Sequence, residues 1–255
     1  MNPRRALAQH SALIRVVRAL GASVLTVPFV HGAFDSVFAK DNALYAQRAD
    51  TTHALFAEPR YRERQAEQSV RRSDLQHAGI SIEPATAAFE GGDVVVVPGR
   101  FAFLGHGFRS SPAAANTLER FLGLPVIPLE LVDPALYHLD TALGILGDGT
   151  ALACDDAFSP HSREVLRRVC PVMPVSREEA LRFAVNFVDV GRAVVTGTDS
   201  EEVTEILSSL GRRTVYTPLD EFHRAGGSAA CLLAPIYDQP TLAIAATTAI
   251  RSTVA

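Results

Sequence analysis

The chain has 255 residues, 47% of them hydrophobic, which is enough apolar material for a large buried core. Its net charge of −4 and its lack of tryptophan argue against nucleic-acid binding, and no apolar run reaches the roughly 20 residues that span a membrane. Its three cysteines form no zinc or disulfide pattern, so we expect a cytoplasmic protein.

The first predicted element is an amphipathic helix near the N-terminus. Apolar residues recur along one face of it, at Leu7, Leu13, Ile14, Val17 and Leu20. The segment that follows, SVLTVP over Ser23–Pro28, predicts a strand.

Four similar units come next, at a spacing of roughly 50 residues. They span Asp35–Pro84, Phe89–Leu131, Tyr137–Val175 and Leu181–Leu219. Each unit predicts a strand, a tight turn, a second strand, a helix and a third strand, with VPGR, GDGT and DVGR as hairpin turns. The expected helix signals are a long helical pattern over Arg60–His77, caps at Ser111 and Ser162, and terminating glycines at Gly79, Gly123 and Gly211.

A fifth unit is divided between the two ends of the chain. Gly226–Tyr237 predicts one strand, and the N-terminal helix with Ser23–Pro28 would supply the rest. Two strands per helix favour a ring over an open doubly wound sheet. We therefore predict one α/β domain over residues 1–255, a five-bladed α/β propeller of ββαβ units closed by both termini. The apolar tail Thr241–Thr248 is expected to add a strand to the fifth unit.

Polar residues occupy the predicted first strand of every unit. They are Asp35 and Asp41, Glu90 and Asp93, His138 and Asp140, Asn186, and Cys231. In a ring, equivalent strands line the axis, so these groups would converge. Each has an ordinary structural explanation alone, since a cysteine in an apolar run is often a small buried hydrophobe. Burying carboxylates in three successive units costs free energy, which is easier to explain if the residues form one functional site. Together, a cysteine, a histidine and several carboxylates indicate nucleophilic catalysis at an electron-poor carbon.

Five stretches in order resemble the guanidine-modifying superfamily of five-bladed α/β propellers, the penteins. They are DSVFAKD, EGGDV, GFRSS, YHLDT and GGSAACL, and the resemblance covers about Gln9–Pro235. Members include dimethylarginine dimethylaminohydrolases, arginine deiminases and amidinotransferases, and the compact chain is most similar to the first. The resemblance implies a central active-site channel, no metal or organic cofactor, and a small guanidino substrate of the arginine or methylarginine type.

The resemblance also implies roles for individual residues. Cys231 matches the nucleophile, His138 the general acid and base, and Glu90 the carboxylate that orients this histidine. Asp41 matches the acid that holds the guanidinium. Asp35 and Arg109 match positions that bind the substrate's amino-acid end, and Arg64 fits an R-x-x-E region of the family. Asp93 is expected to form either a structural hydrogen bond or one directed at the substrate. The implied reaction is hydrolysis through a covalent thiouronium to citrulline and an amine or ammonia.

Two positions depart from the dimethylarginine hydrolases. Asp140 stands where they usually carry a basic residue, and resembles the second clamping aspartate of deiminases and amidinotransferases. Two flanking carboxylates leave little room for N-methyl groups, which favours an unmethylated guanidine. Lys40 stands where related hydrolases often have an acid.

Other interpretations remain open at this stage. An arginine deiminase or dihydrolase would hydrolyse an unmethylated guanidine. In an amidinotransferase acting on such a substrate, an amine would replace water in the second step. Non-catalytic relatives of this fold bind ribosomal subunits but lack the set of Cys231, His138 and Glu90. An unrelated Cys–His protease would need a peptide cleft that nothing indicates. Cys154 and Cys170 are expected to be structural, Asn186 to be a hydrogen-bonding residue, and an exposed blade edge would allow a homodimer.

Overall fold

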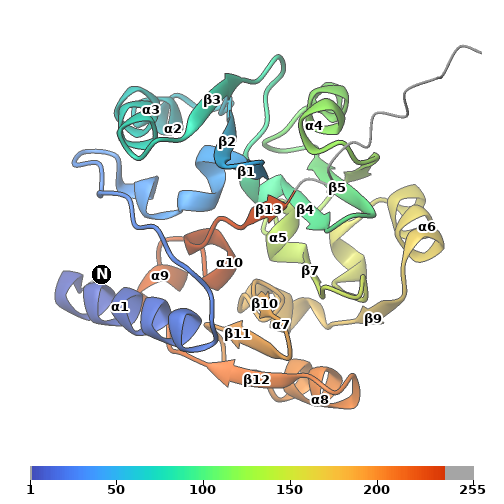
Figure 1. Cartoon of the computed structure of the whole chain (residues 1–255). Helices are drawn as coiled ribbons and strands as arrows, with labels where there is room; N and C mark the ends of the chain where they lie inside the picture. The colour runs from blue at the N-terminus through green and yellow to red at the C-terminus, as the bar shows by residue number, and fades with distance from the viewer. Residues whose placement is uncertain (1, 239–255) are drawn as a thin grey trace, which may run out of the picture.

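The computed structural model describes residues 2–238, and over this range it has a mixed α/β fold with four small sheets. In each sheet two antiparallel strands are followed by a helix and by a third strand that runs parallel to the second. Figure 1 shows the sheets arranged around a common centre, with α3, α4, α6 and α8 on their outer side. The ββαβ repeat predicted from the sequence is therefore present in all four units.

The first two units contain β1 (Ala43–Arg48), β2 (Thr51–Phe56), α2 (Arg62–Gln65), α3 (Gln68–His77), β3 (Ser81–Pro84), β4 (Val94–Val97), β5 (Phe101–His106), α4 (Ala115–Leu122) and β6 (Val126–Glu130). The last two contain β7 (Leu143–Ile145), β8 (Ala151–Ala153), α6 (Pro160–Val169), β9 (Val172–Pro174), α7 (Arg177–Leu181), β10 (Val188–Val190), β11 (Ala193–Thr196), α8 (Glu201–Ser209) and β12 (Arg213–Tyr216). The predicted hairpin turns are confirmed, and each holds a glycine with positive φ: Gly99, Gly149 and Gly191.

The single helix predicted over Arg60–His77 is wrong, because the segment divides into α2 and α3. The break allows two buried arginines to reach the loop before β1. Arg64 donates to the backbone carbonyl of Asp35, and Arg71 donates to those of Pro28 and Ser36. The irregular helix thus supports the loop that precedes the first strand.

Helix capping agrees with the sequence in one case and differs in another. Ser111 caps a short 3₁₀ turn, η4 (Pro112–Ala114), that leads into α4, and α4 ends at Gly123 in the left-handed conformation. The predicted cap Ser162 is wrong, because Ser159 caps α6. Pro160 has no N–H and suits the first helical position, so the residue before it becomes the cap.

The two ends of the chain differ most from expectation. Ser23–Pro28 is not a strand, and Gly226–Tyr237 contains the short helix α10 (Ala229–Leu232) and the start of β13 (Ile236–Asp238). β13 joins the first sheet, parallel to β1, with Ile236 opposite Tyr45. Within residues 2–238, the predicted fifth unit therefore has no sheet of its own. The predicted tail strand Thr241–Thr248 lies outside the described residues.

The N-terminal helix α1 (Pro3–Ala19) is confirmed, and it packs against α9 (Asp220–His223). Leu13, Ile14 and Val17 are buried as predicted. Leu7 was expected on the same face but is 68% exposed, because it lies near the start of the helix. Over the part of the chain that the structure describes, no helix combines the length and apolar character needed to cross a membrane.

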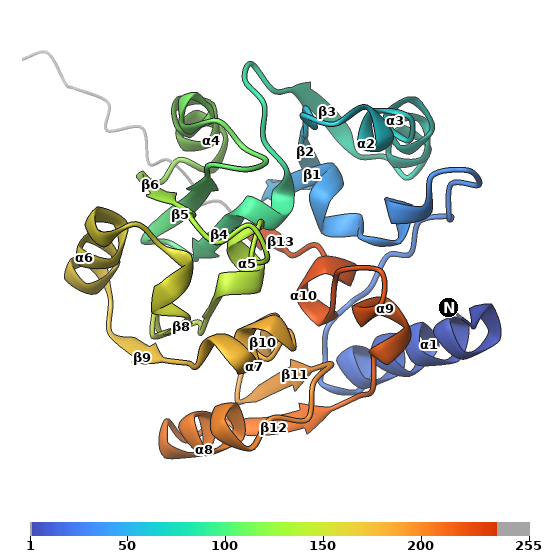
Figure 2. The same ribbon diagram turned by 180° about the vertical axis from the view of Figure 1, so that it is seen from behind.

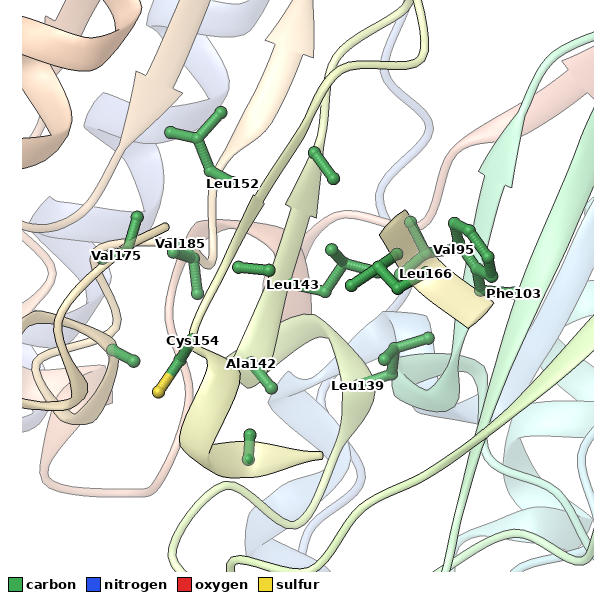
Figure 3. Close-up of a cluster of buried hydrophobic side chains, with 14 of the residues drawn as sticks. Val95, Phe103, Leu139, Ala142, Leu143, Leu152, Cys154, Leu166, Val175 and Val185 are labelled. Carbon is green, nitrogen blue, oxygen red and sulfur yellow. The ribbon is translucent and has the colours of Figure 1, made fainter. Parts of the chain in front are cut away.

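The largest apolar cluster extends from the second unit through the third to the fourth (Figure 3). Val95 and Phe103 of the second unit pack in it with Leu143 of β7 and with Leu139 and Ala142 of the turn α5 (Leu139–Ala142). Cys154 and Cys170 are also buried in this cluster, which agrees with a structural role. Because α5 follows His138 directly and contains Asp140, the same packing fixes two of the predicted site residues.

Candidate active site

The predicted site residues lie in short turns at the entrances of the first strands, not within those strands. Asp41 is in the 3₁₀ turn η2 (Ala39–Asn42), Glu90 directly precedes η3 (Gly91–Asp93), and His138 directly precedes α5. Cys231 lies in α10. In both Figure 1 and Figure 2, α5, α10 and β13 lie near the centre of the ring of sheets.

The turns give buried acids hydrogen-bond donors that a paired strand would not have. The backbone N–H of Gly92 donates to Asp41 Oδ1 at 3.1 Å, and that of Leu139 donates to Asp93 Oδ1 at 3.0 Å. In a strand, these N–H groups would be used by the neighbouring strand. The turn conformation is thus part of what makes buried carboxylates tolerable here.

His138 lies between two carboxylates. Its Nε2 is 2.9 Å from Glu90 Oε2, and its Nδ1 is 3.8 Å from Asp41 Oδ1. Burial by itself lowers the pKa of His138, but the charge of Asp41 and the hydrogen bond to Glu90 outweigh it and raise the pKa to about 9. For Glu90, burial raises the pKa, but the contact with His138 is stronger and the pKa is lowered overall. The pair is therefore an imidazolium and a carboxylate at neutral pH.

The glycines of the EGGD stretch are required by close approach. A Cβ atom on Gly92 would lie 2.7 Å from Asp41 Oδ1 and 2.8 Å from His138 Nδ1. A Cβ on Gly91 would lie 1.9 Å from the carbonyl oxygen of Lys40. Neither glycine has a positive φ, so their role is to let the backbone pass next to the two site residues.

Asp93 has a structural environment. Its Oδ2 accepts from the Ser110 hydroxyl at 2.5 Å and its Oδ1 accepts from Leu139 N–H, while the Ser110 oxygen accepts from the Glu90 N–H. Asp93 has no exposed surface. Both of its oxygens thus tie the turns that carry Glu90 and His138 to each other, and this agrees with the structural alternative of the two expected for it.

Cys231 is 3% exposed, and Asn186 fixes its position. The Asn186 amide nitrogen is 3.2 Å from the sulfur, and its oxygen accepts from the backbone N–H of Ala230 and of Cys231. Both carboxylate oxygens of Asp140 are 3.9 Å from the sulfur. Burial, with the charges of Asp140 and Asp41, raises the pKa of the Cys231 thiol well above its ordinary value.

Lys40 forms a buried ion pair with Asp140. The ammonium nitrogen is 2.9 Å from Asp140 Oδ2, and the two residues are 8% and 2% exposed. Burial lowers the pKa of Lys40, but the charge of Asp140 outweighs it and the pKa is raised overall, so Lys40 is an ammonium at neutral pH.

Three residues predicted at the other end of the substrate have different surroundings. The Arg109 guanidinium lies between the rings of Tyr61 and Tyr137, at 4.6 and 4.7 Å, and 3.5 Å from Glu90. Arg64 is buried and is 3.6 Å from Asp41 and 2.9 Å from Glu67, so its guanidinium is already engaged by the protein. Asp35 is exposed on η1 (Phe34–Val37).

The structure therefore brings Asp41, Glu90, His138, Asp140 and Cys231 to one centre, with Arg109 at its partly exposed edge. The sequence placed Asn186 among the converging polar groups but did not indicate that it contacts the Cys231 sulfur. Its position provides a signal, because it precedes the first strand of its unit as Glu90 does in the second unit.

One group of ligand atoms at the site could hold a metal ion. Asp41, Glu90 and His138 each offer one atom within 4.8 Å of the others. Two of these atoms are already joined by the Glu90–His138 hydrogen bond, so a metal would have to replace it.

Comparisons with known proteins give two groups of relatives. The sequence profile of eukaryotic N,N dimethylarginine dimethylhydrolase matches residues 1–238. The dimethylarginine dimethylaminohydrolase of Mycobacterium tuberculosis is 32% identical over 234 residues, which cover 91% of this chain and 76% of that protein. The bifunctional arginine dihydrolase/ornithine cyclodeaminase ArgZ of Synechocystis sp. is 32% identical over 201 residues, covering 76% of this chain but 28% of its own.

Solved structures give the same two groups of relatives. The substrate-bound N-terminal domain of the cyanobacterial arginine dihydrolase ArgZ aligns with a TM-score of 0.87 and 28% identity, covering 94% of this chain and 89% of that domain. A dimethylarginine dimethylaminohydrolase adduct shares the fold, with a TM-score of 0.73 and 20% identity over 91% of this chain and 90% of that one. The chain belongs to the dimethylarginine dimethylaminohydrolase family of the pentein superfamily, whose hydrolases act on guanidino C–N bonds.

Proposed function

We propose that this protein hydrolyses a guanidino substrate of the arginine type, arginine or an N-methylarginine, to citrulline and ammonia or an amine. The observation that supports this best is the placement of Cys231 beside Asp140, with Asp41, His138 and Glu90 at the same centre. A guanidinium is a resonance-stabilised cation and a poor electrophile, so a catalyst has to fix it and supply a strong nucleophile. Carboxylates and a thiol are suited to these two tasks.

Binding of the cation prepares the nucleophile. In the free site, burial and the neighbouring acids hold Cys231 as a thiol. A guanidinium held by Asp41 and Asp140 brings a positive charge next to the sulfur, which lowers the pKa of the thiol, so that the thiol releases its proton to water and becomes a thiolate. The substrate thus helps to ionise the group that attacks it.

The first step forms a bond between Cys231 Sγ and the guanidinium carbon and breaks a bond from that carbon to a terminal nitrogen. The leaving amine or ammonia takes its proton from His138, which is an imidazolium in the resting site. A covalent S-alkylthiouronium remains on the sulfur. Glu90 holds the ring through Nε2, which leaves Nδ1 for the transferred proton.

The second step is hydrolysis of this adduct. His138, now neutral, accepts a proton from water, the hydroxide adds to the carbon, and the bond to sulfur breaks. The ureido product leaves and Cys231 is regenerated. Arg109, partly exposed at the edge of the site, would bind the carboxylate of the substrate. The Arg64 guanidinium, 3.6 Å from Asp41, would help to hold this carboxylate in place.

We further infer that the four ββαβ units and the terminal segments form a five-bladed propeller. The repeated sheets around one centre and the similarity to penteins support this assignment. The pairing of β13 with β1 is the contact that closes the ring.

The test is incubation with arginine, mono- and dimethylarginine, agmatine and guanidino acids, with ureido product, released amine and ornithine quantified. Ornithine formed together with an amidinated acceptor amine would identify an amidinotransferase. Wild-type protein quenched in acid during turnover is expected to carry a thiouronium mass on the peptide that contains Cys231. Cys231→Ala is expected to form no product, while Cys170→Ala, in the apolar core, serves as the matched control. Turnover by Cys231→Ala at the wild-type rate would reject the covalent route.

A further inference from the structure

Lys40 is the only lysine in the chain. All other residues among the 24 lysines and arginines are arginine, yet this one position, buried beside the nucleophile, carries an ammonium. The chain thus uses arginine for cations everywhere else, including the buried Arg64 and Arg71. The difference between an ammonium and a guanidinium therefore distinguishes this position from the other cationic positions of the chain.

The partner of Lys40 shows what that difference is. The Lys40 ammonium binds one oxygen of Asp140, Oδ2. Within residues 2–238, the other oxygen, Oδ1, has no polar partner apart from the Cys231 sulfur at 3.9 Å. An ammonium acts as a compact point charge, whereas a guanidinium binds both oxygens of a carboxylate as a planar fork. Lysine can neutralise Asp140 and still leave one oxygen free, but arginine would occupy both.

The ion pair lies beside a cavity. Lys40 and Asp140 line a cavity of about 600 Å³ together with Tyr237, apolar residues such as Leu143 and Val185, and charged residues that include Asp189 and Arg212. Asp41, Glu90, His138 and Cys231 do not line it. Asp140 therefore borders this cavity and also lies 3.9 Å from the Cys231 sulfur.

The charges around the sulfur explain why Asp140 needs this ion pair. Asp41 and Asp140 raise the pKa of Cys231, and Lys40 is the neighbouring cation that lowers it. Without Lys40, two carboxylates would share a buried space with the sulfur, and one of them would take up a proton.

We propose that Lys40 is a specificity-determining residue: by pairing with Asp140 through one oxygen only, it keeps a second ionised carboxylate available at the guanidinium site and so directs the enzyme to guanidines with unsubstituted terminal nitrogens. The proposal rests on the proposed function. Asp41 and Asp140 each require an N–H donor from the bound guanidinium. A methyl group on a terminal nitrogen removes one donor and leaves a desolvated carboxylate oxygen without a partner, which is strongly disfavoured.

The first experiment compares kcat/KM for L-arginine and asymmetric dimethylarginine in the wild type, Lys40→Arg, Asp140→Asn and the double variant Lys40→Met/Asp140→Asn. The wild type is expected to prefer arginine by at least about tenfold, which corresponds to about 1.4 kcal/mol. Lys40→Arg keeps the charge but occupies both oxygens of Asp140, so its preference is expected to fall by about the same factor. The double variant replaces both partners with uncharged groups of similar size, which leaves no buried charge unpaired.

The single lysine allows a second measurement that does not depend on turnover. Protein labelled with ¹⁵N at the lysine side chain gives one ammonium signal, that of Lys40. In the inactive Cys231→Ser variant, arginine is expected to shift this signal, because it binds the same carboxylate, and dimethylarginine is expected to shift it less. Asp140→Asn is expected to lower the pKa that this signal reports.

The possible results distinguish a failure of the proposed function from a failure of the proposed role of Lys40. If the wild type turns over no guanidino compound, the proposed function is wrong. If it turns over arginine while Lys40→Arg and the double variant keep the wild-type preference within a factor of about two, the role of Lys40 is wrong and the proposed function stands. A wild type that prefers dimethylarginine, or an ammonium signal that responds to dimethylarginine more than to arginine, would also overturn the role of Lys40.

Discussion

Substitution of Glu90 by glutamine tests the most specific contact of the site. Glu90 Oε2 is 2.9 Å from His138 Nε2, and both residues are buried. Glutamine keeps the shape and one acceptor oxygen but removes the charge. A hydrogen bond to a charged group contributes about 1.5–3 kcal/mol, which corresponds to about 1–2 pKa units. The pKa of His138, about 9 in the wild type, should therefore fall to roughly 7–8 in Glu90→Gln.

The expected result is a change in the pH dependence as well as in the rate. If imidazolium His138 protonates the leaving group, kcat/KM falls above the pKa of this residue, and the alkaline limb should move down by about 1–2 units in the variant. The value of kcat should fall by at least about tenfold, because the ring also loses its orienting partner. The assay is citrulline release between pH 6 and 10, with circular dichroism to confirm the fold.

Glu83→Gln is the matched control. Glu83 also contacts a histidine ring, at 3.2 Å from His53 Nδ1, but it lies on β3 and its side chain is 41% exposed. Its rate and pH profile are expected to equal those of the wild type. A folded Glu90→Gln whose alkaline limb coincides with that of the wild type would refute the assignment of Glu90 as the residue that orients and charges His138.

Three further predictions concern the turns around the site. Gly92→Ala would place a Cβ 2.7 Å from Asp41 Oδ1 and 2.8 Å from His138 Nδ1, so turnover should fall at least about tenfold and the free energy of unfolding by about 1–3 kcal/mol. Gly147→Ala is the control, because the nearest atom to its Cβ would be 3.5 Å away, and it should change neither turnover nor stability. Equal thermal melting and equal activity of the two variants would contradict the close approach. Asn186→Ala leaves the buried N–H groups of Ala230 and Cys231 without their acceptor, so it should lower the free energy of unfolding by about 1–3 kcal/mol. It should also change the rate at which iodoacetamide alkylates Cys231, and an unaltered rate would argue against a role of Asn186 in positioning the sulfur. The raised pKa of His138, about 9 against 6.5 in the unfolded chain, stabilises the fold fully below about pH 6.5 and progressively less up to about pH 9, by about 3 kcal/mol in total. Urea unfolding of the wild type and His138→Gln at pH 6 and 9 measures this, and an equal pH dependence in the two proteins would exclude it.

The repeated units could be predicted from the sequence because turn glycines and apolar periodicity depend only on residues that are close in the chain. The hairpin turns at Gly99, Gly149 and Gly191 need a backbone conformation that glycine adopts readily, and each occurs where the sequence indicates it. The four helix-to-strand steps follow from apolar periodicity. Patterns of this kind depend on neighbours in the chain and need no knowledge of distant contacts.

The strand predicted over Gly226–Tyr237 was wrong because distant contacts decide this segment. The apolar run around Cys231 has the composition of a strand, but the side chain of Asn186 accepts from two of its backbone N–H groups and stabilises a helical turn. Likewise, Ile236 pairs with Tyr45, which lies in the first of the four units. Neither partner can be identified from the segment itself.

The site was predictable by residue type but not by geometry. The repeat indicated that Asp41, Glu90, His138 and Cys231 would converge, and the structure places them in equivalent turns. Alternation within a strand could not show that Asp140 is paired with Lys40, since the two residues belong to different units. The consequence of Asp140 for specificity therefore depends on a contact that only the fold reveals.

The parallel pairing of β13 with β1 has a consequence for how the enzyme is made. Because parallel strands begin at the same edge, the residues before Tyr45 and before Ile236 meet there, and these include Asp41 and Cys231. Asp41, the proposed guanidinium-binding acid, is thus synthesised well before Cys231, the proposed nucleophile. A ribosome-bound chain that has not released α10 already contains the carboxylates and His138 but not the thiol of Cys231. Catalytic activity should therefore appear only when the segments around Asp41 and Cys231 have found each other, which is a contact of high sequence separation and a slow event in folding.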